Sequence, residues 1–169
     1  MSTVALKPAK TEKEINDIAV LANKIWHQHF IPIIGEAQVE YMVAKFQSYP
    51  AITGQIQNDG YEYFQIFIDD KLAGYTGVHA EDQALFLSKL YIHEDFRGNH
   101  LATKALNFLI ELCKERGLEK IWLTCNKYNS NTLAIYDHLG FEVTDEQVAD
   151  IGNGFVMDDY ILTYVVDEN

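Results

Sequence analysis

The sequence predicts a layered α/β (α+β) domain with a mixed, mostly antiparallel sheet of about seven strands and about four flanking helices. Three observations predict it. Hydrophobic patterns follow the order strand, two helices, three strands, helix, strand, helix and two strands, which is typical of a layered domain. The length of 169 residues is that of one domain, so we expect a single domain over residues 1–169. A hydrophobic content of 48% is enough to build its core.

The N-terminal part begins with a strand over residues 3–8. Thr11 and Glu14 then have the spacing of a capping box, in which each side chain binds the other residue's backbone N–H. Apolar residues at helical spacing follow as far as Trp26. We therefore expect a first helix that starts after Thr11 and packs one face on the sheet.

Two turn formers, Pro32 and Gly35, interrupt this helical pattern. A second helix is expected near residues 36–48, where apolar residues again recur at helical spacing. Tyr49-Pro50 should end it, because proline cannot continue the hydrogen-bond pattern of a helix. Residues 51–59 give no clear pattern.

Three strands are expected next. Residues 61–68 and 72–79 are apolar or aromatic and flank the turn Asp69-Asp70-Lys71, which indicates a β-hairpin. Residues 84–92 are almost continuously apolar, as in a central strand that is covered on both faces.

The last third repeats the alternation of helix and strand. Gly117 stands where a glycine commonly ends a helix. The segment from residue 84 to 125 should form a right-handed parallel crossover. The expected helix, strand, helix and two closing strands lie at 101–116, 121–125, 129–139, 141–149 and 154–166.

Charge limits the classes of partner. The net charge is −12, which disfavours nucleic acid and anionic membranes as partners. Residues 89 to 127 carry a net charge of +2, and the rest of the chain carries −14. This division fits an anionic cofactor and a cationic substrate, although ordinary solvated helix faces would also produce it.

Location is expected to be cytoplasmic. No apolar segment typical of a secretory signal follows the start, and no stretch approaches the roughly 18 apolar residues of a membrane span. Two cysteines, Cys113 and Cys125, are too few for a disulfide framework.

The connection between strand 84–92 and helix 101–116 suggests an anion site. The first backbone N–H groups of a helix lack partners and carry partial positive charge, so a loop that leads into them can bind a phosphate. Gly98 permits close approach, and Arg97 and Lys104 add full charges. Taken alone, the segment also fits a plain strand-to-helix turn.

Two motifs give this loop a context. Arg97-Gly98-Asn99-His100-Leu101-Ala102 is similar to the acyl-CoA loop Gln/Arg-x-x-Gly-x-Gly/Ala of the GCN5-related N-acetyltransferase (GNAT) superfamily, and Leu90-Tyr91-Ile92 precedes it at the right distance. A second block, Asn129 with Tyr136 seven residues later and then Gly140-Phe141, also resembles that family. The element order matches the family fold from end to end.

The resemblance implies a three-layer GNAT-like domain that transfers an acetyl group directly from acetyl-CoA to an amine. A main-chain N–H of strand 84–92 would polarise the thioester carbonyl, and the loop N–H groups would hold the pyrophosphate. Tyr136 would be the general acid that protonates the CoA thiolate. The residues implied to bind the cofactor are Leu90, Tyr91, Ile92, Arg97, Gly98, Asn99, His100, Leu101, Ala102, Thr103 and Asn129.

The chain departs from the family pattern at His100, where the family has glycine. Histidine is one of the commoner non-glycine residues at positive φ, so His100 can simply tolerate this conformation. Alternatively it contacts the pyrophosphate, or lowers the affinity for CoA.

A general base is not evident. The inward positions of strand 84–92 are expected to be Phe86, Ser88 and Leu90, none of which is a carboxylate. Other candidates are water held by Ser88 and the hairpin-exit residues His79, Glu81 and Asp82. His27 and His29 have an HxH spacing but no third ligand, so we expect no metal.

The acceptor is expected to be a small, cationic, polyamine-like amine. Trp26, His29, Phe30 and Ser88 are the candidate acceptor-binding residues, with Tyr41 as a further aromatic wall. Nearby acids would attract a cation, and the sequence is loosely similar to bacterial spermidine/spermine acetyltransferases. These acids are Glu36, Glu40, Glu62, Glu81 and Asp82.

Two other functions stay open at this point. One is a protein or peptide acetyltransferase, which would need an open groove. The other is a non-catalytic acyl-CoA binding or sensing domain. A homodimer is also expected, because closing strands in this superfamily often pair between subunits.

Overall fold

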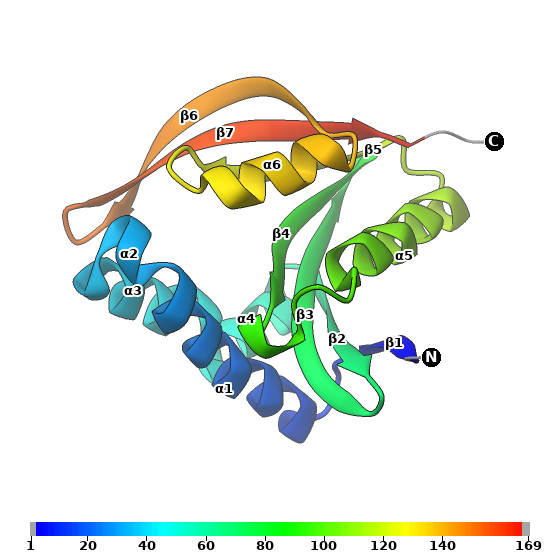
Figure 1. Cartoon of the computed structure of the whole chain (residues 1–169), viewed down its shortest axis with the longest axis horizontal. Coiled ribbons are helices and arrows are strands. Elements are labelled where there is room, and N and C mark those ends of the chain that lie inside the picture. The colour runs from blue at the N-terminus through cyan, green and yellow to red at the C-terminus, as the bar shows by residue number, and fades with distance from the viewer. Residues whose placement is uncertain (1–2, 167–169) are drawn as a thin grey trace.

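The computed structural model describes residues 3–166 and contains one seven-stranded sheet in the order β1-β2-β3-β4-β5-β7-β6 (Figure 1). Neighbouring strands are antiparallel except for β4 and β5, which are parallel. The predicted fold class and strand number are therefore confirmed. The strands are β1 (Val4–Pro8), β2 (Tyr61–Ile68), β3 (Lys71–Glu81), β4 (Ala84–Ile92), β5 (Lys120–Asn126), β6 (Glu142–Gly152) and β7 (Phe155–Val165).

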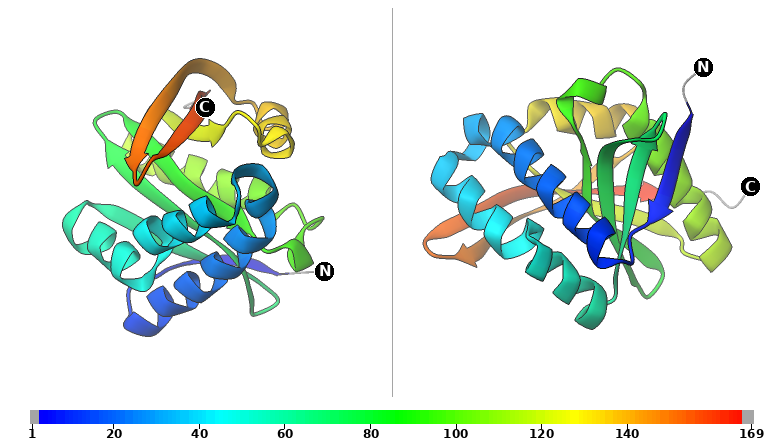
Figure 2. Two further views of the ribbon diagram at one scale, coloured as in Figure 1. Left: turned by 90° about the vertical axis from the view of Figure 1, so that its left-hand side faces the viewer. Right: turned by 90° about the horizontal axis from the view of Figure 1, so that it is seen from below.

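Helices cover both faces of the sheet (Figures 1 and 2). The first helices of the chain pack on one face, where helix α1 buries its apolar side against Tyr63 and Tyr75. Helix α5 packs on the other face against Leu85 and Leu87, and helix α6 joins the same cluster. The α-helices are α1 (Glu12–His29), α2 (Ile31–Ile34), α3 (Glu36–Met42), α4 (Tyr49–Asn58), α5 (Leu101–Arg116) and α6 (Ser130–His138).

Local signals set several of these boundaries as predicted. Thr11 and Glu14 form the capping box at the start of α1. Asp69 and Asp70 both have positive φ in the hairpin turn between β2 and β3. Gly117 ends α5 in the left-handed conformation.

The segment from residue 31 to 59 differs from the prediction. The expected helix over 36–48 is α3 followed by a π-helical turn, Val43–Gln47. Tyr49-Pro50 does not end a helix there, because Ser48 caps a new one: its hydroxyl accepts from the Ala51 N–H, and Pro50 lies in the first turn of α4. Proline is favoured there, since a first-turn N–H needs no helical partner.

Strands β4 and β5 separate after a short paired stretch. Their register runs only from Ala84↔Lys120 to Phe86↔Trp122, and β5 continues along β7 while β4 stays with β3. The rest of β4, from Leu87 to Ile92, has no partner on its β5 side. This divergence opens the sheet, as Figure 1 shows between β4 and β5.

A β-bulge at Ser88 changes which side chains of β4 share a face. Gly77 is opposite Lys89 and the next residue of β3 is opposite Leu87, so Ser88 is the extra residue. Leu87 and Leu90 pack in the cluster beneath α5. Lys89 and Tyr91 instead face the α1 side, where they contact Tyr63 and Tyr75 respectively. The expected inward positions do line one cavity (Phe86, Ser88 and Leu90), although the bulge breaks the simple alternation between them.

Candidate active site

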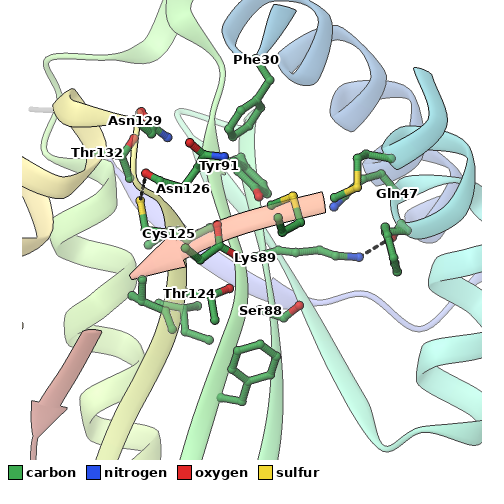
Figure 3. Close-up of a pocket in the computed structure, with 18 of the residues that line it drawn as sticks. Phe30, Gln47, Ser88, Lys89, Tyr91, Thr124, Cys125, Asn126, Asn129 and Thr132 are labelled. Atoms are coloured by element: carbon green, nitrogen blue, oxygen red, sulfur yellow. Dashed lines mark hydrogen bonds between the residues drawn. The ribbon is translucent and has the colours of Figure 1, made fainter. Parts of the chain in front are cut away.

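Two hollows meet where β4 and β5 diverge. The first, which we call the α5 hollow, has a volume of about 600 Å³ and lies before the start of α5. The second, the β5 hollow, has a volume of about 310 Å³ and lies between the diverging strands and the helices of the α1 side (Figure 3). The residues common to both are Leu90, Tyr91, Thr132 and Tyr136.

The α5 hollow contains most of the residues predicted to bind a cofactor. They are Leu90, Tyr91, Ile92, Arg97, Gly98, His100, Leu101, Ala102 and Thr103. Gly98 and His100 have φ values of 87° and 57°, so the loop turns sharply into the helix. This turn leaves the first N–H groups of α5 directed at the hollow, which is the arrangement of an anion site. His100 adopts the left-handed conformation that the family's glycine would supply.

Asn99 lies differently from the other loop residues. Its side-chain amide donates a hydrogen bond to the Phe96 carbonyl oxygen at 2.9 Å, and the residue does not line the α5 hollow. The Asn99 side chain therefore closes the turn through this bond.

Strand geometry provides free backbone groups along β4. The His93 N–H bonds to the Ala73 carbonyl of β3 at 2.8 Å. Since successive N–H groups of a strand point to opposite edges, those of Leu90 and Ile92 point to the edge that β5 has left. They can therefore bond to an extended ligand that lies in the gap.

Tyr136 lies at the junction of the two hollows. Helix α6 carries it, and its ring packs edge-on against Phe141 at 5.2 Å between centroids. Burial raises the pKa of its hydroxyl, with a smaller contribution from Cys125. The hydroxyl thus stays protonated at neutral pH and can donate a hydrogen bond.

Asn129 and His29 approach each other beside this junction. The Nε2 atom of His29 is 3.3 Å from the Asn129 Oδ1 atom. Asn129 lines the β5 hollow, whereas His29 lines the α5 hollow. The sequence predicts His29 in the acceptor site with Trp26 and Phe30, but those two residues line the other hollow. Burial and the nearby charge of Arg97 lower the pKa of His29.

Aromatic rings form one wall of the β5 hollow. Trp26 stacks on Phe30 with 4.2 Å between ring centroids and meets Tyr91 edge-on at 5.6 Å. Trp26, Phe30 and Ser88 all line the hollow, as the sequence predicts for an acceptor site. Tyr41 does not line it, because its hydroxyl bonds to the Ile151 carbonyl at 2.7 Å.

The acids expected near the acceptor lie elsewhere. Glu62 forms an ion pair with Arg116 at 2.6 Å, and Glu81 and Asp82 line a separate hollow. Neither these three nor Glu36 and Glu40 line the β5 hollow. These five acids therefore do not contribute to the hollow, because composition does not say which face of a strand or helix an acid occupies.

Lys89 is a residue of the β5 hollow that sequence reasoning missed. Its side chain is 4% exposed, and its ammonium donates to the Phe46 carbonyl, the Gln55 Oε1 atom and the Tyr63 hydroxyl. Burial lowers its pKa to about 7. Simple alternation placed it on the same face as Leu87, and the bulge at Ser88 turns it to the α1 side of the sheet.

Asp159 of β7 is a second missed residue. It is 3% exposed and lines the β5 hollow, and its Oδ1 atom has no hydrogen-bond partner among residues 3–166. Burial, and to a smaller extent the charge of Asp158, raise its pKa to about 6, while Lys127 opposes the rise. The sequence held one signal: Asp159 alternates with Met157 and Ile161, so an acid occupies an apolar face of a strand.

Among residues 3–166, both a group of side chains suited to a metal ion and a helix suited to a membrane are absent. In the part of the chain that the structure describes, no three His, Cys, Asp or Glu side chains are grouped so that they could hold a metal ion. None of the helices between residues 3 and 166 combines the length and apolar character needed to cross a membrane.

Comparison with known proteins adds a family match. The model of the acetyltransferase (GNAT) family matches residues 24–141. An uncharacterised N-acetyltransferase of Escherichia coli, YjgM, is 28% identical over 90 residues, which cover 51% of this chain and 54% of that protein. The ribosomal protein bS18 alanine N-acetyltransferase of Salmonella typhimurium is 29% identical over 87 residues, covering 50% and 57%. The chain thus spans about half the length of the curated relatives it matches.

Solved structures share the fold over almost the whole chain. The PaiA N-acetyltransferase of Thermoplasma acidophilum, crystallised with coenzyme A, gives a TM-score of 0.80 at 17% identity, covering 96% of this chain and 99% of that one. A chimera of the spermidine N-acetyltransferase SpeG from Vibrio cholerae and hSSAT gives 0.71 at 15% identity, covering 96% and 95%. At these identities the likeness concerns the fold.

Proposed function

The chain belongs to the acetyltransferase (GNAT) family, and we propose that it transfers the acetyl group of acetyl-CoA directly to a primary amine of a small molecule. The observation that carries the proposal is the meeting of two hollows at the divergence of β4 and β5, with Tyr136 common to both. Direct transfer needs the two substrates to enter from different sides and to meet at one point.

The α5 hollow is the proposed site of acetyl-CoA. The N–H groups from Gly98 to Thr103 bind the pyrophosphate, and Arg97 adds a positive charge. The open edge of β4 binds the pantetheine arm, and an N–H there polarises the thioester carbonyl. Asn129 bonds to the cofactor near the same arm. The fit of this loop to an anion, with its positive φ values at Gly98 and His100, supports the assignment.

Tyr136 is the proposed general acid. The leaving CoA thiolate needs a proton or a hydrogen bond as the C–S bond breaks. A buried tyrosine whose pKa is raised by its surroundings keeps its proton until a stronger base forms beside it. Its place between the two hollows supports this role.

The β5 hollow is the proposed site of the acceptor amine. Its volume of about 310 Å³ and its wall of Trp26 and Phe30 favour a small molecule over a protein chain. A cationic, polyamine-like acceptor is one form of this proposal. The alternative is a protein or peptide amine, either a lysine or an N-terminus, and the relative named as an alanine N-acetyltransferase of ribosomal protein bS18 favours keeping it.

The experiment that tests the function is release of free CoA thiol from acetyl-CoA with a panel of amines. The panel contains monoamines, amino acids, spermidine, spermine and short peptides, with a control that lacks an acceptor. Saturable release with a small amine is the expected result. Turnover with peptides alone would support the protein acetyltransferase, and tight acetyl-CoA binding without any turnover would support a sensing domain.

A cytoplasmic homodimer is part of the proposal. Strand β6 is an edge of the sheet and, with its neighbour β7, carries Val143, Val148 and Val156, each more than half exposed. Apolar side chains on an unpaired edge favour pairing with a second chain. Light scattering on the purified protein should give twice the mass of 19.3 kDa.

A further inference from the structure

We propose that Asp159 is the catalytic residue that binds the acceptor amine and takes its proton, an inference that rests on the proposed function. Among the described residues that line the β5 hollow, Asp159 is the one carboxylate. The candidates considered from the sequence lie elsewhere or have other partners. Glu81 and Asp82 line a separate hollow, and His79 is paired with Glu81 at 3.2 Å.

The surroundings of Asp159 leave its Oδ1 atom without a donor from residues 3–166, and Lys127 compensates its charge only in part. Its neighbours across the strands are Asn126 of β5 and Gln147 of β6, both neutral. The adjacent Asp158 has an ammonium partner, since Lys127 Nζ lies 2.9 Å from its Oδ1 atom. A buried carboxylate oxygen without a donor is costly, and a substrate ammonium would supply both the donor and the opposite charge.

Asp159 also lies close to the junction of the two hollows. Tyr91 is common to both, and its pKa is raised mainly by burial and further by Tyr136, Cys125 and Asp159. The charge of Asp159 likewise adds to the effect of burial in raising the pKa of Cys125. A carboxylate that acts on Tyr91 and Cys125 is near the place where the amine must meet the thioester.

The protonation state of Asp159 suits the role. The charged groups that act on it are Asp158 on its own strand and Lys127, which follows the end of β5. Asp159 in turn raises the pKa of Cys125 on β5 and of Tyr91 on β4. Burial brings the pKa of the carboxyl to about 6. The carboxylate is therefore ionised at neutral pH, and it is a stronger base than an exposed aspartate.

The step balances as follows. The acceptor enters as an ammonium and gives one proton to Asp159, which leaves a neutral amine. The amine nitrogen forms a bond to the acetyl carbon, and the bond from that carbon to sulfur breaks. The thiolate takes the Tyr136 proton, and the second proton of the nitrogen returns through water to Tyr136. Asp159 then releases its proton to solvent, so that each turnover yields an amide, a thiol and one proton.

The test compares Asp159→Asn with Asp158→Asn in the full-length protein, using the best amine from the panel. For Asp159→Asn we expect kcat/KM for the amine to fall at least about 100-fold, the usual scale for loss of a general base. The acidic limb of its pH profile, near pH 6 in the wild type, should disappear. The affinity for acetyl-CoA, measured by calorimetry, should stay unchanged and so report that the variant is folded.

Asp158→Asn is the matched control, because it removes a neighbouring carboxylate that does not line the β5 hollow. It should keep the rate and retain an acidic limb, which moves only slightly to lower pH because Asp158 raises the pKa of Asp159. The inference is overturned if Asp159→Asn binds acetyl-CoA normally and keeps the wild-type rate and pH profile, and the proposed function then still stands. A wild-type protein that acetylates no amine would overturn the proposed function and this inference with it.

Discussion

Lys89 and Asp159 are two buried ionisable residues of the same hollow, and they differ in how the protein satisfies them. Both are less than 5% exposed. The Lys89 ammonium has three hydrogen-bond acceptors, whereas the Asp159 Oδ1 atom has no donor in the described chain. The difference suggests that Lys89 braces the structure and that Asp159 is kept free for a substrate.

The partners of Lys89 explain what it braces. It fixes the Phe46 carbonyl of the π-helical turn, and nearby the Tyr75 hydroxyl donates to Gln47 Oε1 at 2.7 Å. Figure 3 shows the Lys89 side chain extending toward Gln47 and away from Asn126 and Asn129. These bonds join the π turn to the sheet and so hold the wall of the β5 hollow in place.

The largest expected effect concerns Tyr136, which like Asp159 is proposed to act in catalysis. Tyr136→Phe removes the hydroxyl and keeps the ring that packs on Phe141. We expect the rate of acetyl transfer to fall by about 100- to 1000-fold, the scale for loss of a general acid. Acetyl-CoA affinity should not change. A variant as active as the wild type in thiol release would remove Tyr136 from the mechanism.

Lys89→Met should lower the stability of the protein in a way that depends on pH. At pH 9 the wild-type lysine is mostly neutral in the folded state, and losing its hydrogen bonds should cost about 2–3 kcal/mol. The folded pKa of about 7 lies below the unfolded value of 10.5, so the wild type gains stability as pH rises between these values.

The variant lacks that gain. The difference in the free energy of unfolding between the wild type and Lys89→Met should therefore be smaller at pH 6 than at pH 9. Urea unfolding at both pH values measures it. A difference that is the same at pH 6 and pH 9 would contradict a buried, neutral Lys89.

Asp159→Asn should have the opposite effect on stability. The folded pKa of about 6 lies above the unfolded value of 3.8, so the ionised carboxylate destabilises the fold fully above pH 6 and not at all below about pH 4. Since one pKa unit corresponds to about 1.4 kcal/mol, we expect the variant to gain about 2–3 kcal/mol at pH 8.

The gain should vanish near pH 4, and urea unfolding at both pH values checks it. Asp158→Asn loses the pair with Lys127 and should show no such gain at pH 8. If Asp159→Asn is less stable than the wild type at pH 8, Asp159 has a structural partner and the comparison with Lys89 fails.

The smallest expected effects concern the two charged neighbours that shift the pKa of Asp159. Asp158 raises its pKa and Lys127 lowers it. Asp158→Asn should therefore move the acidic limb of the pH profile to lower pH, and Lys127→Met should move it to higher pH. Each shift is expected to be about half a unit, the size of a screened charge interaction near the surface. Shifts of the reverse sign would mean that the limb belongs to another group.

Much of the fold could be predicted because its signals are local. The capping box at Thr11, the turn at Asp69-Asp70 and the cap at Gly117 each depend on a few adjacent residues. The start of α4 was missed although its signal is also local. Proline occurs both after the end of helices and in their first turn. The Ser48 cap shows that Pro50 lies in the first turn of α4.

The candidate site likewise contains residues that the sequence identifies and residues that it does not. The loop from Arg97 to Ala102 could be named from the sequence, because a loop that enters a helix carries its donors on consecutive residues. Tyr136 could be named only from the resemblance to the family. Lys89 and Asp159 could not be named as a pair in one cavity. They lie on strands far apart in the sequence, and the bulge at Ser88 decides the face that Lys89 occupies.

The sequence by itself therefore determined most of the elements, their order and the turn that leads into α5. The tertiary structure alone decided where β4 and β5 separate, which charges enter the gap and which of them find partners. The physical reason is that helix caps, turns and periodicity are interactions between near neighbours in the chain. The burial and pairing of a charge depend on every element packed around it.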